Sequence, residues 1–112
     1  MASTLYKKLI RDHIPALIQS QGSGIPSFFS LDERGFRVAV KKKLIEEAKE
    51  VFEARTKQGI IEELGDVLEV IDALIEAFDI SLQEVKTSQQ AKRETRGGFE
   101  KRLFLLSVET ES

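Results

Sequence analysis

The stretch KKKLIEEAKEVFEA, residues 41–54, is followed closely by GIIEELGDVLEVIDALIEAF, residues 59–78. In both, apolar residues recur every three or four positions, as they do along one side of an α-helix. The apolar sides comprise Leu44, Ile45, Ala48, Val51 and Phe52 in the first stretch, and Ile60, Ile61, Leu64, Val67, Leu68, Ile71, Ile75 and Phe78 in the second. The connection at Gly59 is short, so we expect the two helices to pack antiparallel as a hairpin.

Each of these two helices carries acidic residues beside its apolar side. Glu47 and Glu50 are three residues apart, and Glu63 and Asp66 repeat that spacing, so each pair shares one surface of its helix. An antiparallel hairpin brings both acidic edges to the same side of the pair. Because four carboxylates placed together repel one another unless a cation balances them, the sequence predicts a site for divalent ions.

Oxygen ligands of this kind suit Mg²⁺, with Mn²⁺ as an alternative, and both ions suit phosphate chemistry. Glu46 adjoins the cluster and is a candidate for orienting a water molecule or accepting a proton. The competing interpretation is an ordinary solvated helix face, in which Glu46 or Glu47 pairs with Lys42 or Lys43 one turn earlier. The spacing alone leaves both interpretations open.

Helix-capping patterns indicate where the other helices begin. Asp12 is a candidate N-cap for a short helix. Two Ser-x-x-Glu capping boxes occur, at residues 30–33 and 81–84. The first predicts the start of the first long helix, which we extend to about Thr56, and the second predicts a last helix that reaches about Thr95.

Two further segments, residues 27–29 and 99–108, are apolar and favour strands. We therefore predict a mainly α fold, with residues 1–112 as a single domain, a helical hairpin at its centre and the option of a short two-stranded sheet. The apolar sides of the hairpin are wide for a chain of 112 residues. We accordingly expect a homodimer or higher homo-oligomer, with a four-helix-bundle dimer as its unit.

Composition narrows the classes of function. A net charge of −2 gives no whole-surface attraction for nucleic acid. The absence of cysteine excludes disulfides and thiolate metal sites. No apolar run approaches the roughly 20 residues of a spanning helix. We expect a cytoplasmic protein without a nucleic-acid or membrane partner.

Three motifs together resemble the MazG-like all-α nucleotide pyrophosphohydrolase superfamily. They are the pair EExxE at 46–50 and ExxD at 63–66, YKKLIRDHIP at 6–15, and RGGFEKR at 96–102. The last two are similar, in the same order, to the YNKLVRDKIP start and the RGGFxKR-type ending of a small MazG-like subgroup. The sequence has Lys7 where that subgroup has Asn, and His13 where the subgroup has Lys. Neither departure removes a predicted metal ligand, but both lie in the N-terminal segment that the resemblance implies for contacting phosphate, so the subgroup's contacts there do not carry over in detail.

The resemblance implies a MazG-like fold and an Mg²⁺-dependent enzyme that hydrolyses a nucleoside triphosphate to the monophosphate and pyrophosphate. By motif position, the residues that would hold the metal are Glu47, Glu50, Glu63 and Asp66, and the base would be Glu46 or Glu47. The basic residues that would bind the substrate are Lys8, Arg11, Arg96, Lys101 and Arg102.

Three functions stay open at this point. The leading one is removal of non-canonical nucleotides. A phosphoribosyl-ATP pyrophosphohydrolase-like activity is the alternative within the same enzyme class. In the third, the chain is a non-catalytic helical module for oligomerisation or partner binding, and its acidic edges are interface charges.

Overall fold

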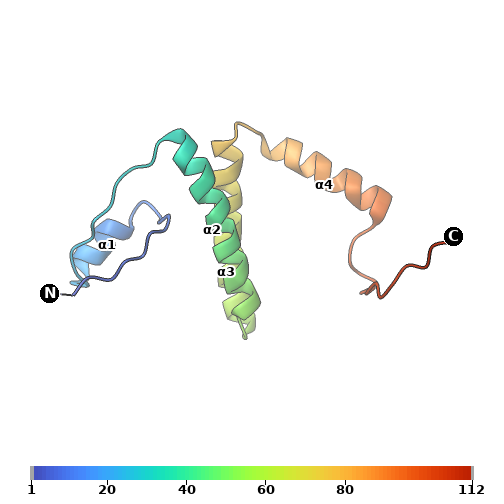
Figure 1. The fold of residues 1–112 in the computed structure, drawn as a ribbon, viewed down its shortest axis with the longest axis horizontal. Helices are drawn as coiled ribbons and strands as arrows, with labels where there is room; N and C mark the ends of the chain where they lie inside the picture. Colours follow the sequence, from blue (N-terminus) through green and yellow to red (C-terminus); the bar gives the residue numbers. More distant parts are fainter. Residues whose placement is uncertain (1, 112) are drawn as a thin grey trace. The chain divides into compact units, whose positions relative to one another are not determined.

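The structure, a computed structural model, describes residues 2–111. It contains the α-helices α1 (Ile14–Ser20), α2 (Glu33–Glu53), α3 (Lys57–Ala77) and α4 (Leu82–Arg96), and no strand occurs among the described residues (Figure 1). The prediction of a mainly α fold is confirmed.

The optional two-stranded sheet is wrong, because residues 27–29 and 99–108 both lack regular structure. A strand needs a neighbouring strand to take up its backbone hydrogen bonds. The segment after α4 instead begins with a turn, in which the N–H of Arg102 donates to the carbonyl of Phe99 over 3.0 Å. Arg102 also has a φ of 55°, outside the extended region.

The chain divides into two compact units, Met1–Ile80 and Ser81–Ser112. The first holds α1, α2 and α3, and the second holds α4 and the segment that follows it. No helix in the described part of the chain combines the length and the apolar character needed to cross a membrane. The assignment of all 112 residues to a single domain stays a prediction.

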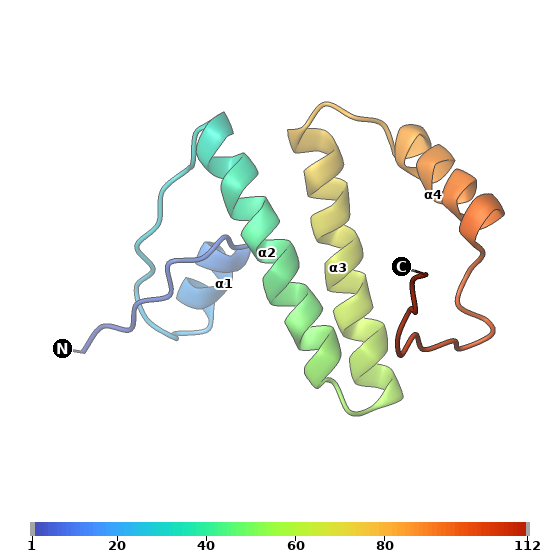
Figure 2. The same cartoon turned by 45° about the vertical axis from the view of Figure 1, so that its right-hand side comes forward.

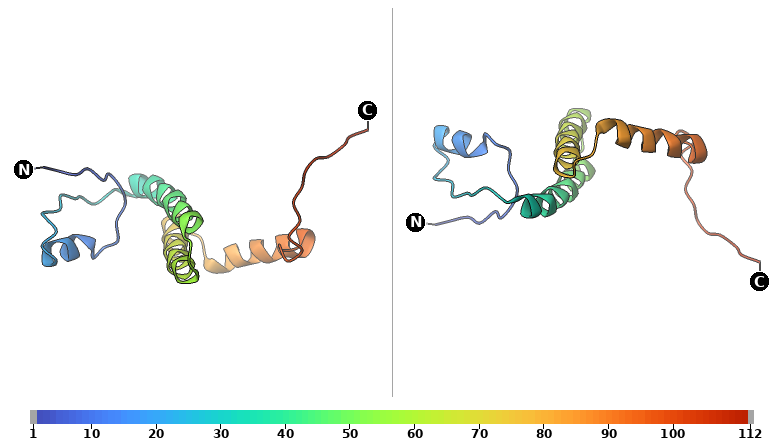
Figure 3. Two further views of the ribbon diagram at one scale, coloured as in Figure 1. Left: turned by 90° about the horizontal axis from the view of Figure 1, so that it is seen from below. Right: turned by 90° about the horizontal axis from the view of Figure 1, so that it is seen from above.

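Helices α2 and α3 form the predicted hairpin and lie side by side in opposite directions (Figures 2 and 3). Their connection is residues 54–56, earlier than expected. Gly59 does not break the helix but lies in the first turn of α3, where its N–H donates to the Thr56 hydroxyl at 3.0 Å. Because that hydroxyl replaces a missing helical acceptor, Thr56 caps the second helix instead of ending the first.

The cap of α2 also differs from the expected one. Asp32 is the N-cap residue, and its carboxylate accepts a hydrogen bond from the Gly35 N–H at 2.7 Å. The predicted capping box at Ser30 is therefore wrong, because a carboxylate directly before the helix fills the same role. Asp12 does not cap α1 either: the residue at that position is His13, whose side chain makes no capping hydrogen bond.

The second capping box is confirmed at the start of α4. The Ser81 hydroxyl accepts from the Glu84 N–H, and the Glu84 carboxylate accepts from the Ser81 N–H at 2.7 Å. That backbone hydrogen bond, with a smaller contribution from the Ser81 side chain, lowers the pKa of Glu84. The helix ends at Gly97, whose φ of 83° strongly favours glycine.

The buried core of the hairpin is small. Among the described residues only Val40 of α2 and Val70 of α3 are buried, with 0% and 8% of their surfaces exposed. Arg37 links α2 to the C-terminal end of α3. Its Nε donates to the Ala77 carbonyl at 2.8 Å, and its guanidinium lies 5.1 Å from the centre of the Phe78 ring. This contact satisfies one of the carbonyls left without a partner at the end of α3.

Part of the expected apolar stripe is not buried in the hairpin. Ile45 is 72% exposed and Phe52 is 88% exposed. The exposed apolar residues recur at helical spacing on both helices, as Val38, Ile45 and Phe52 on α2 and Ile61, Leu64 and Leu68 on α3. We call these six residues the exposed apolar face, and a single copy of the chain leaves it uncovered.

We expect Val40→Ala to lower the free energy of unfolding by about 2 kcal/mol, because two buried methyl groups are lost and a cavity remains. With so few buried side chains, this is a large share of the stability of the hairpin. Urea unfolding followed by circular dichroism measures the change. Val108→Ala, at an exposed position, is the matched control, and an equal loss in both variants would contradict the assignment of the core.

Candidate metal centre

Three carboxylates from the two hairpin helices meet at one place. Glu47 of α2 and Glu63 and Asp66 of α3 each offer an oxygen atom, and these atoms all lie within 4.8 Å of one another. Glu50, the fourth predicted ligand, is exposed and contributes no oxygen to this group. The two acidic edges thus come together as the hairpin argument predicts, with Glu50 at the margin.

The helical period explains why these side chains face one another. Glu47 follows the buried Val40 by about two turns of α2, and Glu63 precedes the buried Val70 by about two turns of α3. Both glutamates therefore lie near the line along which the helices touch. The side chain of Glu47 is only 13% exposed, so it lies closer to the helix contact than its position beside the expected stripe suggested.

The negative charges of the clustered carboxylates are not fully balanced by positive charges. Partial burial raises the pKa of Glu63, and the negative charges of Asp66, Glu50 and Glu47 raise it further, together with a hydrogen bond to Asp66. Although Glu50 lies outside the group of three, its charge still acts on Glu63. A cation bound among these groups would remove the repulsion.

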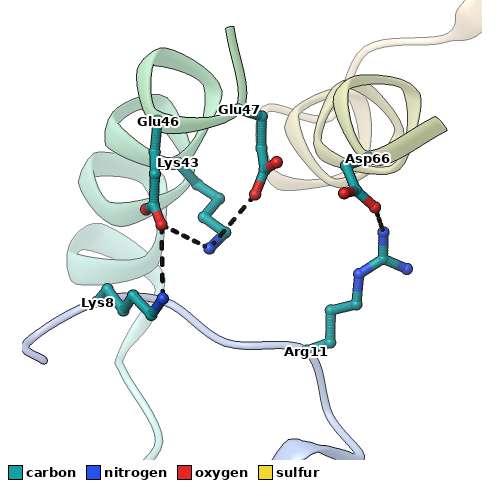
Figure 4. A network of polar contacts seen from close by, with 6 residues as sticks. All are labelled: Lys8, Arg11, Lys43, Glu46, Glu47 and Asp66. Atoms are coloured by element: carbon teal, nitrogen blue, oxygen red, sulfur yellow. Dashed lines mark hydrogen bonds and ion pairs between the residues drawn. The ribbon is translucent and has the colours of Figure 1, made fainter. Parts of the chain in front are cut away.

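The N-terminal segment carries two cations to this cluster. Lys8 Nζ lies 3.7 Å from Glu46 Oε1, and Arg11 donates through one terminal nitrogen to Asp66 Oδ1 at 2.7 Å (Figure 4). Residues 2–11 have no regular secondary structure apart from a bend. Both basic residues expected from the N-terminal motif therefore lie at the carboxylates, far from them in the sequence.

A third cation, Lys43, was not among the predicted site residues. Its Nζ lies 3.3 Å from Glu46 Oε1 and 3.5 Å from Glu47 Oε1, and it points into the space between them (Figure 4). The spacing in KKKLIEE allows both Lys42 and Lys43 to pair with these glutamates. Only the packing of the hairpin shows that Lys43 is the enclosed one, whereas Lys42 is exposed.

The remaining basic candidates belong to the second unit, Ser81–Ser112. Arg96 ends α4, Lys101 and Arg102 follow it, and all three are exposed. In the same unit Arg93 forms an ion pair with Glu100, and this hydrogen bond lowers the pKa of that carboxyl. The role of the three candidates in binding phosphate stays a prediction.

The donor set fits a hard divalent cation. Three carboxylates supply oxygen ligands only, as Mg²⁺ prefers, and the chain has no cysteine to supply a thiolate. Mg²⁺ usually takes few protein carboxylates and keeps several positions for water and substrate phosphate. Three carboxylates therefore leave part of the coordination sphere of such an ion open for other oxygen ligands.

Comparison with known proteins identifies the family. The sequence matches the MazG nucleotide pyrophosphohydrolase domain over residues 38–98, which is more than half of the chain. This range contains the three clustered carboxylates and Glu50. No curated protein and no solved structure matches the chain. Because the matched range covers more than half of an all-helical chain, this protein belongs to the MazG nucleotide pyrophosphohydrolase domain family.

Proposed function

We propose that this protein is an Mg²⁺-dependent nucleoside triphosphate pyrophosphohydrolase that forms a nucleoside monophosphate and pyrophosphate. Membership of the family supports nucleotide pyrophosphohydrolase chemistry in general. The observation that carries the finer proposal is the meeting of Glu47, Glu63 and Asp66 within 4.8 Å. From the N-terminal segment, Arg11 pairs with Asp66 of this cluster and Lys8 pairs with the adjoining Glu46, and both would supply the positive charges that a polyphosphate needs.

The carboxylates Glu47, Glu63 and Asp66 would hold the metal, with Glu50 close enough to add its charge. When bound, Mg²⁺ would neutralise charge on phosphate oxygens and lower the pKa of a nearby water molecule. The oxygen of that water attacks the α-phosphorus, the bond between the α-phosphorus and the bridging oxygen breaks, and pyrophosphate leaves. The proton released by the water passes to a carboxylate of the protein.

Glu46 is the stronger candidate for this proton acceptor. Glu47 contributes an oxygen to the cluster of three, whereas Glu46 lies beside the cluster and faces Lys8 and Lys43. A carboxylate outside the ligand set keeps its lone pairs available for a water molecule. We therefore assign Glu47 to the metal and Glu46 to the water.

Arg11 is well placed to change partners when substrate binds. Its guanidinium pairs with Asp66, and both side chains are about half exposed. A cation at the carboxylates weakens the attraction between Arg11 and Asp66, while a phosphate offers the same guanidinium a bidentate partner. Lys8, which is also partly exposed beside Glu46, acts in the same way as a point charge.

We further propose that the exposed apolar face joins a second copy of the chain. Two hairpins packed through this face make a four-helix bundle, which is the usual way for amphipathic helices of this length to cover their apolar sides. In the described part of a single chain only Val40 and Val70 are buried, so the chain has little core of its own and the second copy would add most of it.

The fold does not determine which substrate is hydrolysed, so the proposed substrates share only the anhydride that is cleaved. Removal of non-canonical nucleoside triphosphates is the proposed role, and phosphoribosyl-ATP is the alternative substrate because it presents the same anhydride. The non-catalytic module is disfavoured by the arrangement of Lys8 and Arg11, since an acidic interface has no need for two cations brought from a distant segment.

The test is the release of pyrophosphate from canonical and modified nucleoside triphosphates and from phosphoribosyl-ATP, with Mg²⁺ and with EDTA. We expect metal-dependent release, with one monophosphate formed for each pyrophosphate. Release that continues in EDTA would contradict the proposed metal dependence. A folded protein that hydrolyses nothing in the panel would favour the non-catalytic module.

A further inference from the structure

Lys43 is enclosed to an unusual degree for a lysine on a helix. The side chains of Lys43 and Glu47 are 15% and 13% exposed, and their charged atoms are 3.5 Å apart. In each of the other five ion pairs among residues 2–111, at least one partner is 36% exposed or more. An ordinary surface pair is screened by water and contributes little, but this pair is shielded beside the metal centre.

We propose that Lys43 is a positioning residue, which holds the carboxylates of Glu46 and Glu47 in fixed positions relative to each other. It thereby fixes the place of Glu46, which orients the water, relative to Glu47, which binds the metal. The inference rests on the proposed hydrolase function. An ammonium group has three donors, and Lys43 Nζ reaches one oxygen of each glutamate, at 3.3 and 3.5 Å. One side chain thereby links the two roles assigned to neighbouring residues.

This arrangement has two consequences of opposite sign. The positive charge of Lys43 repels a divalent cation held by Glu47, so the lysine weakens metal binding. The same charge holds Glu46 in one place, and a displacement of about 1 Å at a reacting group is enough to cost about 100-fold in rate. Lys43 thus lowers the affinity for metal while it raises turnover. A lysine that only stabilised the helix would still repel the cation, but its replacement would leave kcat unchanged, so the fall in turnover separates the two roles.

The experiment compares Lys43→Met with the wild-type protein. Methionine keeps the length of the apolar stem but lacks the charge. We expect the Kd for Mn²⁺, measured on the metal-free protein by electron paramagnetic resonance, to fall about tenfold. We expect kcat for the nucleotide to fall about 10- to 100-fold with little change in KM. Lys43→Arg keeps the charge, so it should retain the Mn²⁺ affinity and most of the turnover.

Lys42→Met is the matched control, because Lys42 is exposed and forms no ion pair in the described part of the chain; it should leave both properties unchanged. The proposal is overturned if Lys43→Met binds Mn²⁺ no more tightly than the wild type, or if its kcat stays within about twofold. If Lys43→Met does not fold, Lys43→Gln must show the same pair of shifts.

The proposed function fails separately, if the wild-type protein itself shows no metal-dependent hydrolysis. The Mn²⁺ titration does not depend on turnover and then decides about Lys43 alone. Tighter binding without the charge supports its place beside the metal, and unchanged or weaker binding overturns it.

Discussion

Glu63→Gln should strongly reduce metal-dependent hydrolysis and at the same time stabilise the metal-free protein. The loss of one ligand carboxylate is expected to reduce kcat/KM by about 10²- to 10³-fold. The gain in stability follows because Glu63 is partly buried among Asp66, Glu50 and Glu47, which disfavour its charged form. Pyrophosphate release and thermal unfolding in EDTA measure the two effects.

The same variant should also change how the stability of the metal-free protein depends on pH. Because the pKa of Glu63 is raised in the folded protein, the folded state holds this proton more tightly than the unfolded state does. The stability that this proton confers is present below the ordinary pKa of a glutamate and is lost as the pH rises through the raised one. In EDTA, from about pH 4 to about pH 8, Glu63→Gln should therefore show a smaller fall in Tm than the wild type.

Glu62→Gln is the control for both measurements. Glu62 is the exposed neighbour of Glu63 on α3, lies outside the cluster of three and only accepts a hydrogen bond from Gln58 at 3.4 Å. Its substitution should alter neither hydrolysis nor the Tm of the metal-free protein appreciably. Equal losses of activity in the two variants would remove the special role of Glu63.

The double variant Ile45→Glu and Leu68→Glu should convert the proposed dimer into monomers. These residues are 72% and 61% exposed in the single chain and belong to the exposed apolar face, one on each helix. In a symmetric four-helix bundle each substitution places like charges in an apolar contact. We expect each to weaken association by at least about 30-fold, as for a central interface residue.

Sedimentation equilibrium over a range of protein concentrations measures this association. Gln58→Glu adds a negative charge at an exposed polar position of α3 and should leave the dimer intact. A wild-type protein that stays monomeric throughout, or a double variant that associates as tightly as the wild type, would contradict the proposed four-helix bundle.

The sequence by itself determined mainly the interactions between residues close together in the chain. The capping box of Ser81 and Glu84 is confirmed, and all of its partners lie within one helical turn, whereas the equally local box predicted at Ser30 is replaced by a cap at Asp32. The acidic pairs were also visible, since a spacing of three residues fixes a shared helix surface wherever the helix begins. The hairpin followed from a short connection between two amphipathic segments, although Thr56, rather than Gly59, sets the boundary.

Only the tertiary structure decided which charged groups face one another. Arg11 and Asp66 are 55 residues apart, and no periodic pattern relates the N-terminal segment to α3. By spacing, Lys42 can reach Glu46 and Lys43 can reach both Glu46 and Glu47, but only the structure shows that Lys43 is enclosed and Lys42 is exposed. Residues 99–108 likewise had the composition of a strand, but no neighbouring strand occurs among the described residues. The spacing of residues in the sequence specifies where a side chain lies on its own helix. The distances between charged atoms, the burial of a side chain and the pairing of a strand depend on the segments packed against it, and only the tertiary structure gives these.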